Sequence, residues 1–263
     1  MEVLFIVFLF IFGLIFGSFF NVVGLRIPKE EPFANDRSRC PACRKELAWY
    51  ELIPVISFML QGGKCRSCKS KISLLYPTVE LFTGILFVLC YMQLGFQLEL
   101  LTALLFISML MIIFVSDIRY MLIPNKILLF FLPAFIILRI IIPLEPWWSS
   151  VVGALAGSGI IFVIILLSRG GMGAGDMKLF FLLGIVLGTK KVLLAFFFAC
   201  LFGAVIGIIL MLLKIIRRKQ PVPFGPYIVA AAVISYFYGE QIIHWYFWNF
   251  NKILYLFLPF PIV

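Results

Sequence analysis

Long apolar runs recur along the whole 263-residue chain, and each is close to the ~20 residues that a helix needs to cross a bilayer. Short segments with charged residues, proline or glycine separate these runs. We therefore expect an all-α polytopic membrane protein with about eight transmembrane helices. The predicted spans cover residues 3–25, 74–94, 99–115, 127–143, 149–167, 192–213 and 225–243, with a shorter one at 178–188.

The composition of the chain agrees with this prediction. The chain is 63% hydrophobic and 13% charged, whereas soluble domains average about 45–50% and 25%. The first run has Glu2 where a signal peptide has basic residues, and no small-residue cleavage site follows it, so we expect a retained span. The apolar tail 244–263 carries Trp245 and Trp248, which are typical of the membrane interface.

The distribution of basic residues predicts how the spans are oriented. Residues 26–73 hold 10 of the 22 Lys and Arg residues, and the "KIIRRK" segment at 214–219 adds four, so we expect both segments in the cytoplasm. Lys190 and Lys191 fall on the opposite side and break this rule. Because the net charge of +10 is divided among short loops, it indicates topology and attraction to anionic lipid, and we expect no nucleic-acid partner.

Residues 26–73 are the one stretch that could form a module outside the membrane, since charge, proline and cysteine are concentrated there. At under 50 residues the stretch is too short for a self-sufficient core and needs a cross-link. We therefore divide the chain into a first transmembrane helix (1–25), a cytoplasmic loop (26–73) and a transmembrane helical domain (74–263).

Four cysteines in this loop have the spacing of a metal site. Cys40 and Cys43 form "CPAC", Cys65 and Cys68 form "CRSC", and 21 residues separate the pairs. Four thiolates can close the tetrahedral sphere of a structural zinc ion, which predicts a small zinc-stapled domain. The alternative is a pair of disulfides or a redox couple, and the expected cytoplasmic location disfavours stable disulfides.

Two aspartates, Asp117 and Asp176, lie at the ends of apolar runs. An ionisable group at membrane depth costs about 2.5–3.5 kcal/mol on insertion scales, so it suggests a function. Two carboxyl groups a few ångströms apart cannot both ionise easily. One can then take a proton from attacking water while the other donates to an oxyanion or a leaving amine, although nothing indicates which is the base.

The "GMGAGD" segment gives Asp176 a surrounding that Asp117 lacks. Gly171, Gly173 and Gly175 leave the backbone open to positive φ and to close approach by an extended peptide. A phosphate loop is not supported, because no Gly-Lys-Ser/Thr follows. The alternative is a flexible loop in which each acid pairs with Lys178 or Arg119.

Other catalytic arrangements are poorly supported. His244 is the only histidine, which excludes a zinc protease with the HExxH motif, and we expect it at the interface beside Trp245. Ser158 lies in "LAGSGI", where Ala156 replaces the glycine usual for an intramembrane serine protease, so we expect a small packing residue.

Seven segments in this order resemble the type IV prepilin peptidases, which are bifunctional aspartyl proteases and N-methyltransferases of bacterial pilus, competence and type II secretion systems. The segments are "GSFFNVVGLRIP" (17–28), the tetracysteine loop, "WYELIPVISF" (49–58), "YPTVELFTG" (76–84), "DIRYMLIPN" (117–125), "GAGDMK" (173–178) and "PFGPY" (223–227). The resemblance implies catalytic roles for Asp117 and for Asp176 of the GxGD motif, with Gly173, Gly175 and Lys178 in the active-site loop. It also implies a bacterial plasma (inner) membrane protein that cleaves prepilin or pseudopilin leaders after a glycine on the cytoplasmic side.

The same resemblance implies methylation of the new amino group from S-adenosylmethionine. All four cysteines are present, which favours retention of this second activity. No Rossmann-type glycine motif occurs, so the sequence does not indicate where the cofactor binds. Glu80 is a candidate for holding the amine, and its alternative role is a helix-end acid paired with Lys71.

Two rival functions remain open from the sequence. A proton-coupled transporter could use Asp117 and Asp176 as a relay, but such acids are expected near the membrane midplane in repeated halves. A non-catalytic assembly factor could bind pilins without cleaving them. The sequence does not indicate the oligomeric state.

Overall fold

The computed structural model describes residues 2–32, 37–168, 172–217 and 222–257, the side chains of 250–257 excepted. Within these residues the chain forms helices and two isolated β-bridges but no strand, which confirms the all-α class. The elements are α1 (Glu2–Arg26), η1 (Ile27–Lys29), η2 (Trp49–Glu51), α2 (Ile56–Leu60), α3 (Leu75–Leu94), α4 (Leu98–Tyr120), α5 (Asn125–Ile141), α6 (Ser149–Leu167), α7 (Ala174–Leu212) and α8 (Gly225–Phe257).

Five of the described helices are long and apolar enough to cross a membrane, namely α1 continued through Lys29, α3, α4, α6 and α7. The 39 residues of α7 are divided into two rods at Gly188, which has a φ of 74° and a ψ of 178°. With α7 counted twice and α5 and α8 included, the described residues form eight rods, in agreement with the predicted number. The chain is a multi-pass membrane protein.

Two predicted helix boundaries differ from the structure. The span expected at 178–188 begins earlier, at Ala174, so Asp176 lies in its first turn, while the kink at Gly188 separates it from the span expected at 192–213 as predicted. α8 continues to Phe257, so the expected tail 244–263 is largely helical, and 258–263 lie outside the described residues. Hydropathy alone does not fix the terminal residues of a helix, which differ by a few positions from the ends of the apolar run.

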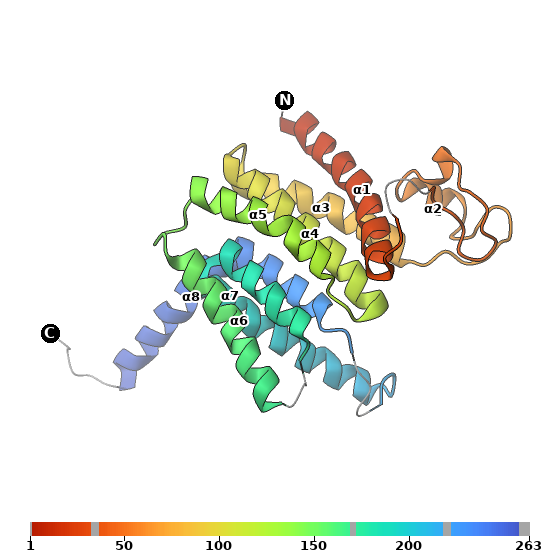
Figure 1. The fold of residues 1–263 in the computed structure, drawn as a ribbon. Coiled ribbons are helices and arrows are strands. Elements are labelled where there is room, and N and C mark those ends of the chain that lie inside the picture. Colours follow the sequence, from red (N-terminus) through yellow and green to blue (C-terminus); the bar gives the residue numbers. More distant parts are fainter. Residues whose placement is uncertain (1, 33–36, 169–171, 218–221, 258–263) are drawn as a thin grey trace.

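Small residues allow the helices to pack closely. Figure 1 shows α3, α4 and α5 side by side, with α6, α7 and α8 on the other side of α4 and the loop module beside one end of α1. A Cβ on Gly13 of α1 would lie 2.7 Å from Cα of Gly84 of α3. A Cβ on Gly153 of α6 would lie 2.7 Å from the carbonyl oxygen of Gly184 of α7.

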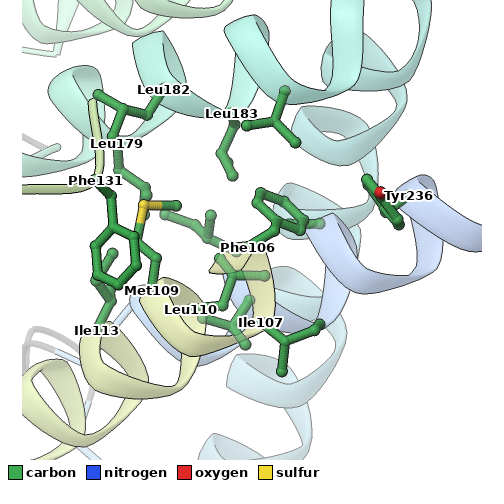
Figure 2. Packing of buried hydrophobic residues seen from close by; sticks show 14 of the residues in the cluster. Phe106, Ile107, Met109, Leu110, Ile113, Phe131, Leu179, Leu182, Leu183 and Tyr236 are labelled. Atoms are coloured by element: carbon green, nitrogen blue, oxygen red, sulfur yellow. The ribbon is translucent and has the colours of Figure 1, made fainter. Parts of the chain in front are cut away.

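The helix α4 forms the centre of the bundle. All of its side chains from Phe106 to Ile113 are buried, as expected of a helix that is apolar on every face. Figure 2 shows Phe106 and Met109 of α4 packed toward Leu179 and Leu183 of α7. This packing fixes the relative positions of the helices that carry the two aspartates.

A largely buried ion pair joins four helices at the opposite end of the bundle from Asp117. Arg139 Nη1 and Nη2 donate to Glu99 Oε2 and Oε1 at 2.8 and 2.9 Å, and Tyr236 Oη donates to Oε1 at 2.6 Å. Nη2 also donates to the carbonyl oxygen of Val186 at 2.8 Å, near the end of the first α7 rod. The cluster therefore connects α4, α5, α7 and α8.

We expect Arg139→Leu to lower the free energy of unfolding by about 3–5 kcal/mol, because Glu99 then lies largely buried without its cation. Glu99→Leu combined with Arg139→Leu should destabilise the protein less than the sum of the two single changes. Unfolding in mixed micelles, followed by circular dichroism, measures this difference. Additive losses in the double variant would contradict the coupling.

Candidate active site and metal centre

Asp117 lies in the last turn of α4 and is 5% exposed. Its Oδ2 accepts a 2.7 Å hydrogen bond from the backbone N–H of Gly225, the first residue of α8. A helix N-terminus has unpaired N–H groups and a partial positive charge, both of which stabilise a carboxylate. A fixed backbone group therefore orients the Asp117 side chain.

Asp176 lies in the first turn of α7 and is 9% exposed. Its Oδ2 accepts a 3.0 Å hydrogen bond from the backbone N–H of Gly173, the residue before the helix. An acid at the third helical position commonly reaches back in this way to satisfy an N-terminal N–H group. The contact explains why α7 begins at Ala174, and it holds the carboxyl group at the end of the helix.

The carboxyl groups of Asp117 and Asp176 belong to different helices, at the adjacent ends of α4 and α7. Among the described residues, neither forms an ion pair with Lys178 or Arg119, and Lys178 Nζ instead donates to Asn125 Oδ1 at 3.0 Å. The alternative that paired each acid with a neighbouring cation is therefore wrong. Two interacting carboxyl groups held by backbone N–H groups can share a proton and act as acid and base.

The glycines of the GxGD segment provide space for close packing. The sequence suggested that these glycines adopt a positive φ. In the structure Gly173 has a φ of −78° and Gly175 is helical, so neither does. A Cβ on Gly175 would lie 3.1 Å from Cβ of Ile123, in the connection after α4. This close contact brings the start of α7 beside the end of α4. Gly171 lies outside the described residues.

A pocket of about 680 Å³ lies between α5, α6 and α7. Its walls are mainly apolar, and Asn125 and Lys178 provide polar groups on its lining. Met177 and Lys178 of the lining directly follow Asp176 in the first turns of α7, whereas neither aspartate lines the pocket. Its volume is within the range of sites that bind small ligands or peptide side chains.

Neither Ser158 nor His244 belongs to a catalytic arrangement. Ser158 Oγ donates to the carbonyl oxygen of Ala154 at 2.7 Å, which is typical of a packed helical serine. His244 is exposed on α8 and stacks on Trp248 with ring centroids 6.4 Å apart. Both contacts agree with the roles expected from the sequence.

Glu80 connects α3 to the loop module. Its carboxyl group is buried, and Oε2 accepts a 2.8 Å hydrogen bond from the backbone N–H of Val55. Among the described residues it forms no ion pair with Lys71, so that alternative role is wrong. The helix α1 passes close by, since a Cβ on Gly17 would lie 2.7 Å from Cα of Glu80.

The four loop cysteines form a compact cluster. The sulfurs of Cys40, Cys43, Cys65 and Cys68 lie within 4.8 Å of one another, and all four are free thiols. The Sγ atoms of Cys40 and Cys68 are 3.8 Å apart, which matches the edge of about 3.8 Å in a tetrahedron with Zn–S bonds of about 2.3 Å. The residues therefore fit a zinc ion, and they are not arranged as disulfides.

Two similar turns present these sulfurs. The N–H of Arg44 donates to the Cys40 carbonyl at 2.8 Å, and the N–H of Lys69 donates to the Cys65 carbonyl at 3.0 Å. Both Arg44 and Lys69 have a φ of 58°. Isolated bridges, Arg39 with Glu46 and Lys64 with Lys71, close the two turns. Each pair thus approaches the centre in the same backbone geometry.

Local hydrogen bonds favour the thiolate form of two of the sulfurs. The backbone N–H of Cys43 lowers the pKa of Cys40 to about 6, and the Ser70 hydroxyl lowers the pKa of Cys68. For Cys43 the largest single effect, the hydrogen bond from the backbone N–H of Lys45, lowers the pKa. Desolvation and the neighbouring thiols together outweigh it, because they disfavour the thiolate, and the pKa of Cys43 rises to about 11. A divalent cation relieves this repulsion, since metal binding deprotonates coordinating thiols.

Gly225 was missed as a site residue in the sequence, although it lies in the "PFGPY" segment. A Cβ at this position would lie 2.6 Å from Asp117 Oδ2, so only glycine fits. A glycine that opens a helix gives no sequence signal of its own, because its partner is an aspartate more than 100 positions earlier. By contrast, the buried ion pair could have been predicted, because Arg139 is a charged residue within an apolar run.

These observations define a multi-pass helical membrane protein with two buried aspartates at one end of the bundle and a cluster of four cysteines. The profile of the Bacterial Peptidase A24 N-terminal domain matches residues 11–94, and that of the Type IV leader peptidase family matches residues 104–208. No solved structure matches the chain.

Curated relatives extend over nearly the whole chain. The prepilin leader peptidase/N-methyltransferase of Bacillus subtilis (strain 168) is 47% identical over 90% of this chain and 96% of its own length. The proteins of the same name from Aeromonas hydrophila and Neisseria gonorrhoeae are 33% and 30% identical, over 92% and 88% of this chain and 93% and 90% of their own lengths. The chain belongs to the type IV leader peptidase family.

Proposed function

We propose that the protein is a membrane aspartyl endopeptidase that removes the leader peptide of type IV prepilins or pseudopilins and then N-methylates the new N-terminal residue. The observation that supports the peptidase activity is that two buried carboxyl groups, each held by a backbone N–H, lie on the adjacent ends of α4 and α7. Family membership and the relatives' names support the substrate class and the second activity.

In the proposed reaction Asp117 and Asp176 divide one proton between them. The ionised carboxylate takes a proton from water while the water oxygen bonds to the scissile carbonyl carbon. The protonated partner donates its proton to the departing amine as the carbon–nitrogen bond breaks. The N–H groups of Gly225 and Gly173 keep the two carboxyl groups oriented throughout.

We propose that the pocket between α5, α6 and α7 receives part of the substrate. Its apolar walls lie between membrane-spanning helices, so they suit an apolar side chain more than a charged one. Lys178 and Asn125 contribute polar groups to the lining. Because Gly173 and Gly175 have no side chains, the start of α7 leaves space beside the aspartates.

We propose that the aspartate end of the bundle faces the cytoplasm and that the membrane is the bacterial plasma (inner) membrane. The support is the basic charge of residues 26–73 and 214–219. On this orientation, three parts of the chain meet at the cytoplasmic side: the first helix (1–25), the loop (26–73) and the helical domain (74–263).

We propose S-adenosylmethionine as the methyl donor and a zinc ion as the structural centre of the loop. The donor supplies an electrophilic methyl group, which the free N-terminal amine of the cleaved substrate accepts with loss of a proton. Glu80 is our candidate for holding that amine, since its carboxyl group lies where α3 meets the loop module.

A proton-coupled transporter is not favoured. Asp117 and Asp176 lie in the last and first turns of their helices, at one end of the bundle. A relay across the membrane needs acids near the midplane.

Replacing either aspartate tests the peptidase activity. Asp117→Asn or Asp176→Asn should slow leader removal by about 10²–10⁴-fold or more, because the pair loses its base or its acid. Cleavage of a purified prepilin by the full-length enzyme in nanodiscs, followed by mass spectrometry, measures both cleavage and addition of one methyl group. Wild-type cleavage rates in either variant would contradict the assignment.

Gly225→Ala should also slow cleavage, by about 10²-fold, because the added Cβ displaces the Asp117 carboxylate. Gly207→Ala is the matched control, since a Cβ there meets no atom within 4 Å. The comparison uses the initial rate of leader cleavage at equal amounts of folded enzyme. Equal rates for the two variants would show that the Gly225 contact does not position Asp117.

Purified protein should contain one zinc ion per chain by mass spectrometry of the metal. Cys43→Ser and Cys68→Ser each remove a thiolate and should lower the zinc content. Cys200→Ser is the control and should leave the zinc content unchanged, because Cys200 lies in α7, away from the cluster. Absence of zinc from the wild-type protein prepared without chelators would overturn the proposed centre.

A further inference from the structure

The loop module exposes a short apolar segment, residues 52–60, that is called the anchor segment here. It contains no charged residue. Met59 and Leu60 are 72% and 77% exposed, and Trp49, just before the segment, is 78% exposed. Other exposed apolar side chains in the segment are Leu52, Ile53 and Ile56. A patch of this kind beside polar turns indicates a binding surface.

The backbone of the anchor segment contacts the second turn of α3. The N–H of Val55 contacts the Glu80 carboxylate of α3, and Glu80 is five residues into that helix. At 1.5 Å per residue, Glu80 lies about 7–8 Å below the start of a helix that is about 30 Å long. This helix length matches the hydrocarbon thickness of a bilayer, so Val55 lies about as deep as an interfacial helix does, roughly 5–10 Å.

Val55 is held there in a strained conformation. Its φ of 60° and ψ of −51° are unfavourable for a β-branched residue, and such angles persist only where surrounding contacts impose them. The hydrogen bond to buried Glu80 is one such contact. The anchor segment is therefore fixed against α3 at this depth and does not hang free from the module.

The charges next to the anchor segment suit an anionic lipid surface. No acidic residue occurs between Glu51 and Glu80, and Glu51 caps the backbone N–H of Ala48 at 3.0 Å. Four basic residues fall in this interval, and all are exposed: Lys64, Arg66, Lys69 and Lys71. Basic residues beside a membrane-embedded segment attract anionic lipid headgroups.

We infer that the anchor segment inserts into the anionic leaflet of the same bilayer that α1 and α3 cross. Met59, Leu60 and Ile56 enter the boundary of the acyl chains, while the basic residues between 64 and 71 contact lipid headgroups. The tetracysteine module is thereby held at a constant height beside the aspartate end of the bundle. This inference does not depend on the proposed peptidase or methyltransferase activity.

Photolabelling of the full-length protein tests the insertion. The protein is placed in nanodiscs that contain phosphatidylglycerol with a diazirine on a shallow acyl carbon, irradiated and mapped by peptide mass spectrometry. Peptides with residues 53–60 should carry adducts, as should the ends of α1. Peptides with residues 40–47, in the first cysteine turn, provide the internal control and should remain unlabelled.

The double variant Met59→Asp with Leu60→Asp should lower labelling of 52–60 several-fold and leave labelling of α1 unchanged. Replacing phosphatidylglycerol by phosphatidylcholine carrying the same diazirine should also lower it, and equal labelling would overturn the anionic preference. Absence of adducts from 52–60 in wild-type protein with labelled α1 would overturn the insertion. Protection of 52–60 from amide exchange without adducts would also overturn it, by showing that protein covers the segment.

Discussion

The contact between the Asp117 carboxylate and the N–H of Gly225 is the constraint on which the rest of the site depends. Asp117 ends the central helix of the bundle, where few water molecules reach it and no cation accompanies it among the described residues. A buried carboxyl group in such a place needs a hydrogen-bond donor that is already fixed. The start of α8 supplies that donor, and the absence of a side chain at Gly225 lets it approach to 2.7 Å.

The two ends of the bundle stabilise buried acidic side chains in different ways. At the aspartate end the acids are held by backbone N–H groups, so each carboxyl group retains freedom to exchange a proton. At the other end Glu99 is held by the guanidinium of Arg139 and the hydroxyl of Tyr236, which keeps its charge neutralised. The first arrangement suits chemistry and the second suits rigidity. Because α4 takes part in both, the rigid end supports the reactive one.

Much of this architecture could be predicted from the chain. Apolar periodicity predicted the all-α membrane class, and the spacing of Cys40, Cys43, Cys65 and Cys68 predicted a four-sulfur cluster. The cost of an acid at membrane depth singled out Asp117 and Asp176. Long-range contacts could not be predicted in this way, because the N–H of Gly225, the backbone of Val55 and the carbonyl of Val186 become partners only through packing. The break between the spans predicted at 178–188 and 192–213 agrees with the kink at Gly188, whereas the start of the first of them at Ala174 was missed because Gly173 and Gly175 suggested an extended loop.

The central claim is that two carboxyl groups act as one acid–base pair at this end of the bundle. The most direct test is the pH dependence of kcat/KM for leader cleavage by the wild-type enzyme in nanodiscs of fixed composition. One ionised and one protonated carboxyl group predict a bell-shaped profile, with activity lost on both the acidic and the alkaline side. A profile with a single limb, or one that is flat across the range in which the protein stays folded, would contradict the paired mechanism.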